Sequence, residues 1–229
     1  APDNLMYLEF RSISKRFPGV QALEDVSFGV AEGEAHALIG ENGAGKSTLL
    51  KLLGGSLQPT SGAIWIDGEE RHFGSAREAL AAGIAVIQQE LQLVPERSVA
   101  ENLFLGHLPA QLGWVNKRKL MSLATEQLAL VGEERIHPAT LVSALPIAQR
   151  QMVELAKALT RGAKVVAFDE PTSSLSEREV QRLFSIIREL KIRGQVVLYV
   201  SHRLEELFQV CDSARSEEHT SELQSPNTI

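Results

Sequence analysis

The sequence is poor in cysteine: Cys211 is its only one, so an internal disulfide is excluded. This cysteine usage suits the reducing conditions of the cytoplasm. Basic residues are not in excess either, since 23 Lys and Arg stand against 29 Asp and Glu and give a formal net charge of −6. Because binding to nucleic acid requires a basic surface, this charge argues against nucleic acid as a main partner.

The sequence also lacks a hydrophobic run long enough to span a membrane. Its longest apolar runs, such as residues 196–200, have the length of a core strand. No signal peptide is recognisable among the first residues, so we expect any role at a membrane to come through a partner protein. The scattered histidines show no metal-ligand spacing, and we expect structural or surface roles for His36, His72, His107 and His137.

What is present is the composition of an ordinary globular protein, 44% hydrophobic and 23% charged over 229 residues. This length suffices for one large α/β domain. Continuous apolar runs predict strands buried on both faces of a parallel sheet, at residues 84–87, 165–168 and 196–200. Shorter strands at residues 7–13, 22–30 and 63–66 suggest an antiparallel sheet around the strand 35–39. Apolar periodicity predicts helices at residues 49–53, 121–131, 147–159 and 177–192.

A glycine-rich motif carries the clearest chemistry. Residues 40–48 read Gly40, Glu41, Asn42, Gly43, Ala44, Gly45, Lys46, Ser47, Thr48 and fit the pattern G-x-x-x-x-G-K-[ST]. The motif lies between a predicted strand and a predicted helix, the context that distinguishes a phosphate-binding loop from a chance match. Its glycines let backbone N–H groups point at a phosphate, Lys46 adds positive charge, and Ser47 offers a hydroxyl to Mg²⁺. The motif therefore predicts binding of a nucleoside triphosphate.

Further polar residues follow the predicted parallel strands. Asp169 and Glu170 come directly after the strand 165–168, where a carboxylate can hold Mg²⁺ and its neighbour can polarise an attacking water. Gln89 follows the strand 84–87, where its amide could reach Mg²⁺ or the attacking water and so act as a catalytic residue. His202 follows the strand 196–200. A fifth segment lies just ahead of the helix 147–159 and reads Leu145, Pro146, Ile147, Ala148, Gln149.

The order of these motifs resembles the nucleotide-binding domain of the ATP-binding cassette (ABC) family, over about residues 8–212. The resemblance implies a P-loop NTPase (RecA-like) parallel-sheet core, an antiparallel β subdomain and an α-helical signature subdomain. It implies ATP and Mg²⁺ as cofactors, with Ser47, Gln89 and Asp169 at the metal. The implied roles are a Walker A motif at residues 40–48, a Q-loop at Gln89, a signature motif at residues 145–149 that acts on the opposite cassette, a Walker B motif ending at Asp169, the catalytic Glu170 and the switch His202. Phe17 stands where the family stacks an aromatic ring on adenine, although residues 17–19 could equally form a turn with a buried Phe.

A closer resemblance is to the bacterial monosaccharide importers of the ribose, galactose, arabinose and xylose type. It is carried by residues 15–20, 40–47, 81–87, 89–91, 93–96, 98–102 and 201–206. It implies the first of two tandem cassettes, at the cytoplasmic face of the bacterial inner membrane. The implied partners are membrane permease subunits, a second cassette and, indirectly, a periplasmic sugar-binding protein; these partners determine which sugar is carried.

Two other functions are weighed against this interpretation. A soluble ABC ATPase acting on ribosomes or DNA would usually retain a full Leu-Ser-Gly-Gly signature and often a basic linker, and neither occurs here. A GTPase would read guanine through Asn-Lys-x-Asp, which residues 116–119 match only in their first half, since Lys119 carries the wrong charge.

The sequence departs from the family at three places. Pro146 replaces the signature serine and can offer neither a hydroxyl nor an N–H. Ser176 stands where most members have Asp; with Glu179 it fits a capping box for the helix 177–192. From Arg215 the sequence is polar and resembles the translation of a sequencing adapter. We therefore expect the domain to span residues 6–213, with Met6 as a candidate start, and residues 214–229 to be a non-native tail that leaves the sheet edge exposed.

Overall fold

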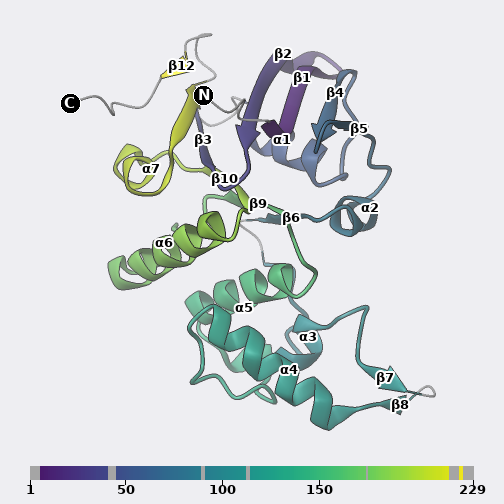
Figure 1. Cartoon of the computed structure of the whole chain (residues 1–229), viewed down its shortest axis with the longest axis vertical. Coiled ribbons are helices and arrows are strands. Elements are labelled where there is room, and N and C mark those ends of the chain that lie inside the picture. The colour runs from purple at the N-terminus through teal and green to yellow at the C-terminus, as the bar shows by residue number, and fades with distance from the viewer. Residues whose placement is uncertain are drawn as a thin grey trace.

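The computed structural model describes residues 6–40, 45–88, 91–111, 114–173, 175–216 and 222–223. Figure 1 shows two sheets in the upper part of the molecule and a group of helices below them. The predicted mixed α/β fold with a parallel-sheet core, an antiparallel sheet and a helical part is confirmed.

The antiparallel sheet has four strands in the order β2-β1-β4-β5. Its strands are β1 (Met6–Phe17), β2 (Val20–Ala31), β4 (Ser61–Ile66) and β5 (Glu69–Arg71). The strand 35–39, which we expect this sheet to surround, is not one of its members: in the described part of the chain β3 (Ala35–Ile39) pairs within the other sheet, and its Leu38 packs against the antiparallel sheet. The reason is burial on both faces, since Ala35, Ala37 and Leu38 are fully buried and suit the interior of a parallel sheet.

The parallel core has the strand order β12-β11-β3-β10-β9-β6. It comprises β3, β6 (Ile84–Ile87), β9 (Val165–Asp169), β10 (Val196–Val200), β11 (Ser213–Ser216) and β12 (Glu222–Leu223), the last pairing antiparallel with β11. Side chains along β10 alternate between two hydrophobic cores. Val197 and Tyr199 face the helical side, whereas Val196, Leu198 and Val200 face α1 (Lys46–Leu53) and the antiparallel sheet.

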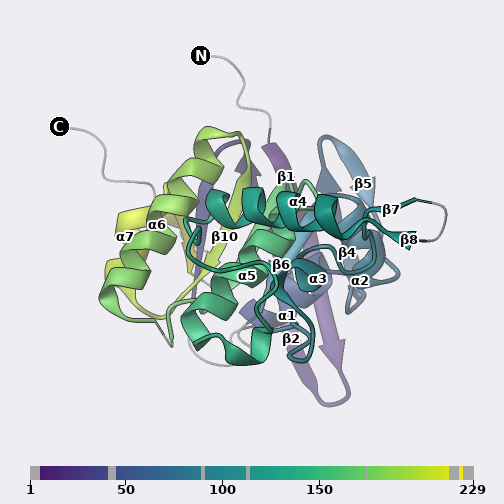
Figure 2. The ribbon, with the colours of Figure 1, turned by 90° about the horizontal axis from the view of Figure 1, so that it is seen from below.

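The helices lie largely on one side of the parallel sheet, and Figure 2 views the molecule from this end. They are α3 (Val99–Leu103), α4 (Lys117–Leu130), α5 (Ile147–Leu159), α6 (Glu177–Ile192) and α7 (Leu204–Val210), with α2 (Ala76–Ala81) beside β6 and a short hairpin of β7 (Ala110–Gln111) and β8 (Trp114–Val115). The predicted bounds of α5 and α6 are confirmed. A 3₁₀ turn, Val142–Ala144, precedes α5.

Helix α4 begins four residues before its predicted start. Asn116 caps it, because its side-chain oxygen accepts a hydrogen bond from the N–H of Lys119 at 3.0 Å. This cap explains the Asn at position 116 without any guanine-binding role.

The edge of the parallel sheet beside β3 is occupied by the first residues of the predicted tail, 214–229. Ala214 and Arg215 of β11 pair with Ala37 and Leu38. The Arg215 guanidinium lies 5.4 Å from the centre of the Phe28 ring. We expect the tail to begin at residue 214. In the structure its first residues extend the parallel sheet.

No helix in the described part of the chain is long and apolar enough to cross a membrane. This agrees with the length of the apolar runs in the sequence.

We predict that Ser176→Ala lowers the free energy of unfolding by about 1 kcal/mol, the usual contribution of a helix cap. The Glu179 carboxylate accepts hydrogen bonds from the N–H and the hydroxyl of Ser176, at 2.8 and 2.7 Å. These bonds lower the pKa of Glu179, so their stabilisation exists above its ordinary pKa and is lost as the pH falls through the lowered value. Urea unfolding at pH 7 and pH 3 measures the change. Ser185→Ala, on the exposed face of the same helix, is the matched control, and an equal loss in both variants would contradict the cap.

Candidate functional site

The candidate site lies at the carboxyl edge of the parallel sheet. In the strand register, Val200 of β10 stands beside Leu38 of β3 and beside Asp169 of β9. Because these strands end at the same level, the residues that follow them meet at one edge, where ligands bind in open α/β sheets. The register thus brings together residues as distant in the sequence as Leu38 and Val200.

The phosphate loop connects β3 to α1. Gly45 has a φ of +90°, a backbone conformation that favours glycine, and the helix begins at the next residue. Lys46 is 6% exposed, and its ammonium donates a hydrogen bond to the carbonyl oxygen of Gly40 at 2.5 Å. The predicted residues Glu41, Asn42, Gly43 and Ala44 lie outside the described part of the chain. The loop thus leads from a strand into a helix, as the sequence predicts, with Ser47 and Thr48 in the first turn of α1.

Asp169 at the end of β9 faces the start of α1. The Ser47 hydroxyl lies 3.5 Å from the nearer carboxylate oxygen of Asp169, at the limit of a hydrogen bond. Burial raises the pKa of Asp169, and the neighbouring Glu170 adds to this, whereas Ser47, Lys46 and Lys51 oppose it. A half-buried carboxylate opposite a hydroxyl is an oxygen donor set that suits Mg²⁺, which takes few protein ligands and completes its shell with water and phosphate.

Among the described residues, no group of three His, Cys, Asp or Glu side chains could hold a metal ion. The pair of Ser47 and Asp169 is compatible with Mg²⁺ carried by a nucleotide, because phosphate oxygens and water would complete the shell of the ion. Gln89, the third predicted ligand, lies outside the described residues.

Glu170 and His202 lie next to each other. The Nδ1 atom of His202 is 3.4 Å from a carboxylate oxygen of Glu170, and the imidazole is the more exposed of the two. Glu170 has a φ of +49°, which is uncommon for any residue other than glycine. Its N–H donates to the carbonyl oxygen of Val200 at 3.0 Å, so the β10 strand holds the residue in this conformation. Backbone strain of this kind is concentrated at functional sites.

Phe17 ends β1 with 36% of its surface exposed, and the Lys15 ammonium lies 5.2 Å from its ring centre. The alternative of a buried Phe in this turn is thereby excluded.

The segment 145–149 belongs to the helical part of the molecule. Leu145 is buried, Pro146 directly precedes α5, and Ile147 is half exposed at the first helical position. The guanidinium of Arg150 fixes the approach to the helix, donating to the carbonyl oxygens of Leu145 and Ser143 at 2.8 Å each. Among the side chains of this segment, Pro146 brings no capping oxygen to α5.

Sequence reasoning did not single out Glu206, a buried carboxylate beside this edge that is surrounded by donors from Thr172, Tyr199 and Ser201. In the sequence it is one of two consecutive glutamates. Only the phase of α7 turns Glu206 inward and Glu205 outward, and seven residues give a weak periodic signal.

The chain is similar in sequence to known proteins. Residues 23–173 match the sequence profile of the family described as ABC transporter. The chain is 56% identical over 207 residues to the arabinose import ATP-binding protein AraG of Vibrio parahaemolyticus serotype O3:K6, and 55% identical over 207 residues to that of Chromohalobacter salexigens. Each alignment covers 90% of this chain but only 41% and 42% of the relatives, so the chain spans about two fifths of their length.

Solved structures give the same fold. A nucleotide-free ATP-binding cassette from an ABC transporter superimposes with a TM-score of 0.82 and 26% identity, covering 93% of this chain and 87% of that one. An ATP-binding cassette in its ADP conformation gives a TM-score of 0.79 with 25% identity and the same coverage.

We predict that Asp169→Asn stabilises the nucleotide-free chain at pH 7. A raised carboxyl pKa means that the folded chain binds the proton more tightly than the unfolded chain, so stability decreases as the pH rises from the ordinary to the raised pKa. Asparagine resembles the protonated acid and avoids this cost. The urea midpoint of the variant should exceed that of the unmodified chain at pH 7, and the difference should shrink in acid. Glu24→Gln, at an exposed carboxylate, is the control; a lower midpoint for Asp169→Asn at pH 7 would refute the prediction.

Proposed function

The chain belongs to the ABC transporter family, and from this premise we propose that residues 6–213 form an ATPase unit that energises import of a monosaccharide through a membrane permease. The observation that carries the proposal is the meeting of Lys46, Asp169, Glu170 and His202 at one edge of the sheet. The likeness to arabinose import ATP-binding proteins supports a sugar as the cargo.

In this proposal the nucleotide phosphates bind at the start of α1. The loop 40–48 would surround them with backbone N–H groups, and Lys46 would exchange its contact with Gly40 for phosphate oxygens. Phe17 is exposed at the end of β1 and free of the core, so its ring can stack on adenine.

Mg²⁺ would be held by Ser47 and Asp169, with Gln89 as a further ligand. When bound, it would neutralise charge that develops on the phosphate oxygens. The distance of 3.5 Å between the two side chains supports their sharing one ion.

Hydrolysis requires an oriented water and a place for its proton. The Glu170 carboxylate would accept the proton as the water oxygen bonds to the γ-phosphorus and the bond to the β,γ-bridging oxygen breaks. His202, 3.4 Å away, would orient this carboxylate and contact the γ-phosphate. Catalysis is then mainly a matter of positioning.

A second cassette would complete the site. In the family, the signature segment of one cassette contacts the nucleotide held by the other, so residues 145–149 would act in trans. Pro146 supplies no hydroxyl and no N–H, so only the N-terminal end of α5 remains to attract phosphate. We therefore infer that this cassette offers its partner a weakened half-site.

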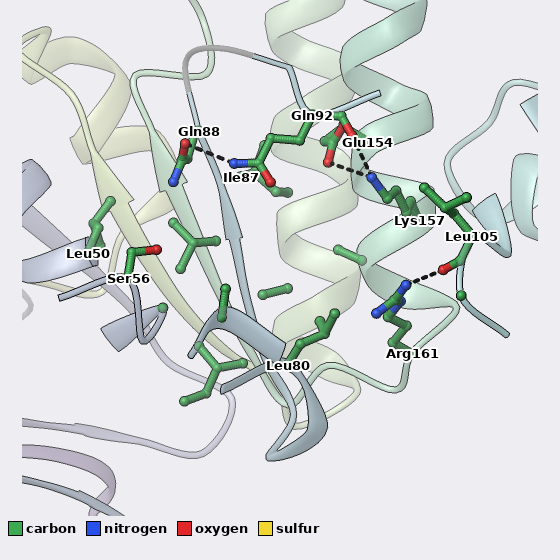
Figure 3. A pocket seen from close by; sticks show the side chains of 17 residues that line it. Leu50, Ser56, Leu80, Ile87, Gln88, Gln92, Leu105, Glu154, Lys157 and Arg161 are labelled. Carbon is green, nitrogen blue, oxygen red and sulfur yellow. Dashed lines mark hydrogen bonds and ion pairs between the residues drawn. The ribbon is translucent and has the colours of Figure 1, made fainter. Parts of the chain in front are cut away.

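The permease would bind at the cavity drawn in Figure 3. This cavity of about 410 Å³ separates β6 and α2 from α5, and apolar side chains such as Leu50 and Leu80 line it. Polar groups bound it: Lys157 donates to the carbonyl oxygen of Gln92 at 2.7 Å, and Gln92 donates to Gln88 at 3.1 Å. Gln88 directly follows β6. A permease helix inserted into this cavity would therefore contact a segment that moves together with the end of β6. This arrangement supports transmission through the region 89–102.

We place the unit at the cytoplasmic face of the bacterial inner membrane, where the permease would connect it indirectly to a periplasmic sugar-binding protein. The rival function, a soluble ATPase acting on ribosomes or DNA, is disfavoured by the net charge of −6 and by the named relatives. Stimulation of ATP hydrolysis by permease and loaded binding protein, and not by ribosomes or DNA, would distinguish the two functions.

We predict that Glu170→Gln in the complete protein leaves ATP affinity within twofold and lowers turnover by about 10²–10⁴-fold, the range expected for loss of a general base. Equilibrium binding of ATP and release of phosphate measure the two quantities. Lys46→Ala is the comparison variant: it should lower ATP affinity, because it removes the positive charge that binds the phosphates. Turnover that is unchanged in Glu170→Gln would remove Glu170 from the catalytic role.

We predict that Pro146→Ser raises ATP turnover of the two-cassette protein several-fold, because the new hydroxyl can contact the nucleotide held by the partner cassette. Ala139→Ser, at an exposed position before the segment, adds a hydroxyl elsewhere and should have no effect. Equal turnover in Pro146→Ser and in the unmodified protein would show that the segment does not limit hydrolysis.

A further inference from the structure

A buried carboxylate lies directly behind the candidate site. Glu206 on α7 is 6% exposed, yet its carboxylate is surrounded by four hydrogen-bond donors. A carboxylate is retained at such depth only when its oxygens are satisfied, because an unpaired buried charge is strongly destabilising. The donors therefore indicate which segments of the chain the Glu206 carboxylate holds together.

Three hydroxyl groups converge on one oxygen of Glu206. Thr172, in the loop after β9, donates at 2.8 Å; Tyr199 of β10 donates at 3.1 Å; and Ser201, directly after β10, donates at 3.2 Å. Arg203 donates to the other oxygen at 3.2 Å. The carboxylate thus joins the ends of two parallel strands to the helix that follows them.

The contacts with Ser201 and Arg203 enclose His202. The Ser201 hydroxyl donates to Glu206 and also accepts a hydrogen bond from the N–H of Arg203 at 3.0 Å. This closes a tight turn with His202 at its centre, in the manner of a serine turn. The N–H of Glu206 in turn donates to the carbonyl oxygen of Arg203 at 3.1 Å.

The contact with Thr172 restrains the other partner. Thr172 is buried and lies two residues after Glu170, whose left-handed backbone is tied to Val200. The loop between these two anchors is short, so Glu170 has little freedom to move away from His202.

Tyr199 acts as a lasting hydrogen-bond donor in this network. Burial raises the pKa of the Tyr199 hydroxyl, and Glu206 raises it further, so the phenol remains a donor at all physiological pH values.

We propose that Glu206 is a positioning residue that sets the contact between Glu170 and His202 by anchoring the loops that carry them. The proposal rests on the proposed function, in which these two side chains act on the attacking water. The hydrogen bonds of the Glu206 carboxylate go to Thr172, Tyr199, Ser201 and Arg203, so we expect it to act on Glu170 through the loop of Thr172 and on His202 through the turn formed by Ser201 and Arg203.

The test compares Glu206→Gln with Glu205→Gln, an exposed neighbour on the same helix, in the complete protein. The amide keeps the size of the side chain but removes the charge. We expect Glu206→Gln to lower turnover at least tenfold with ATP affinity within twofold, and Glu205→Gln to change neither. Thr172→Val should reproduce the loss of turnover, and Thr172→Ser, which keeps the hydroxyl, should restore it. Turnover within twofold for Glu206→Gln, or a loss matched by an equal loss of ATP affinity, would overturn the proposal.

Hydrogen exchange on the nucleotide-free protein gives a readout that does not depend on hydrolysis. In Glu206→Gln, exchange should accelerate at residues 170–173 and at residues 201–204 together, while β3 and β9 remain protected. Acceleration of only one segment, or of the whole sheet, would refute the positioning role. If the unmodified protein binds ATP without hydrolysing it, the proposed function fails, and the exchange result alone decides whether Glu206 holds the two loops.

Discussion

The parallel pairing of β10 with β3 on one side and β9 on the other is the constraint on which the rest of the site depends. It brings Leu38, Val200 and Asp169 to the same level. Hydrogen bonds of a parallel ladder fix this level along the whole strand, so a shift of one residue would move every side chain to the opposite face. The buried side chains of β10 oppose such a shift on both faces, because they belong to two different cores.

The loops beyond the strands are held by polar contacts rather than by further packing. Lys46 is anchored to Gly40, Glu170 to Val200, and the turn around His202 to the carboxylate of Glu206. Each contact joins a side chain or N–H group to a partner far away in the sequence or across a turn. These contacts restrain Lys46, Glu170 and the turn around His202, and restraint of binding groups in advance lowers the cost of binding.

The sequence predicted those parts whose signals are local. The bounds of α5 and α6 follow from apolar periodicity, and the loop between β3 and α1 follows from the motif spacing together with the strand and helix that flank it. The pairing partners of β3 could not be predicted, because strand pairing depends on which other strands can bury both faces and not on chain order. Glu206 was missed for a related reason: its donors lie in three separate segments, and no spacing within the sequence reveals that they converge.

At position 170 the residue that is best for stability differs from the residue that the proposed chemistry requires, because Glu170 has a positive φ. Holding a side chain other than glycine in the left-handed region costs about 1–2 kcal/mol, a cost that glycine would avoid. Selection for thermal stability alone would therefore favour loss of the carboxylate, and β-branched residues would be rejected whatever their polarity. A library of variants at position 170 that is selected only for stable folding would be enriched in glycine. If Glu170 has its proposed role, these stable variants would not hydrolyse ATP.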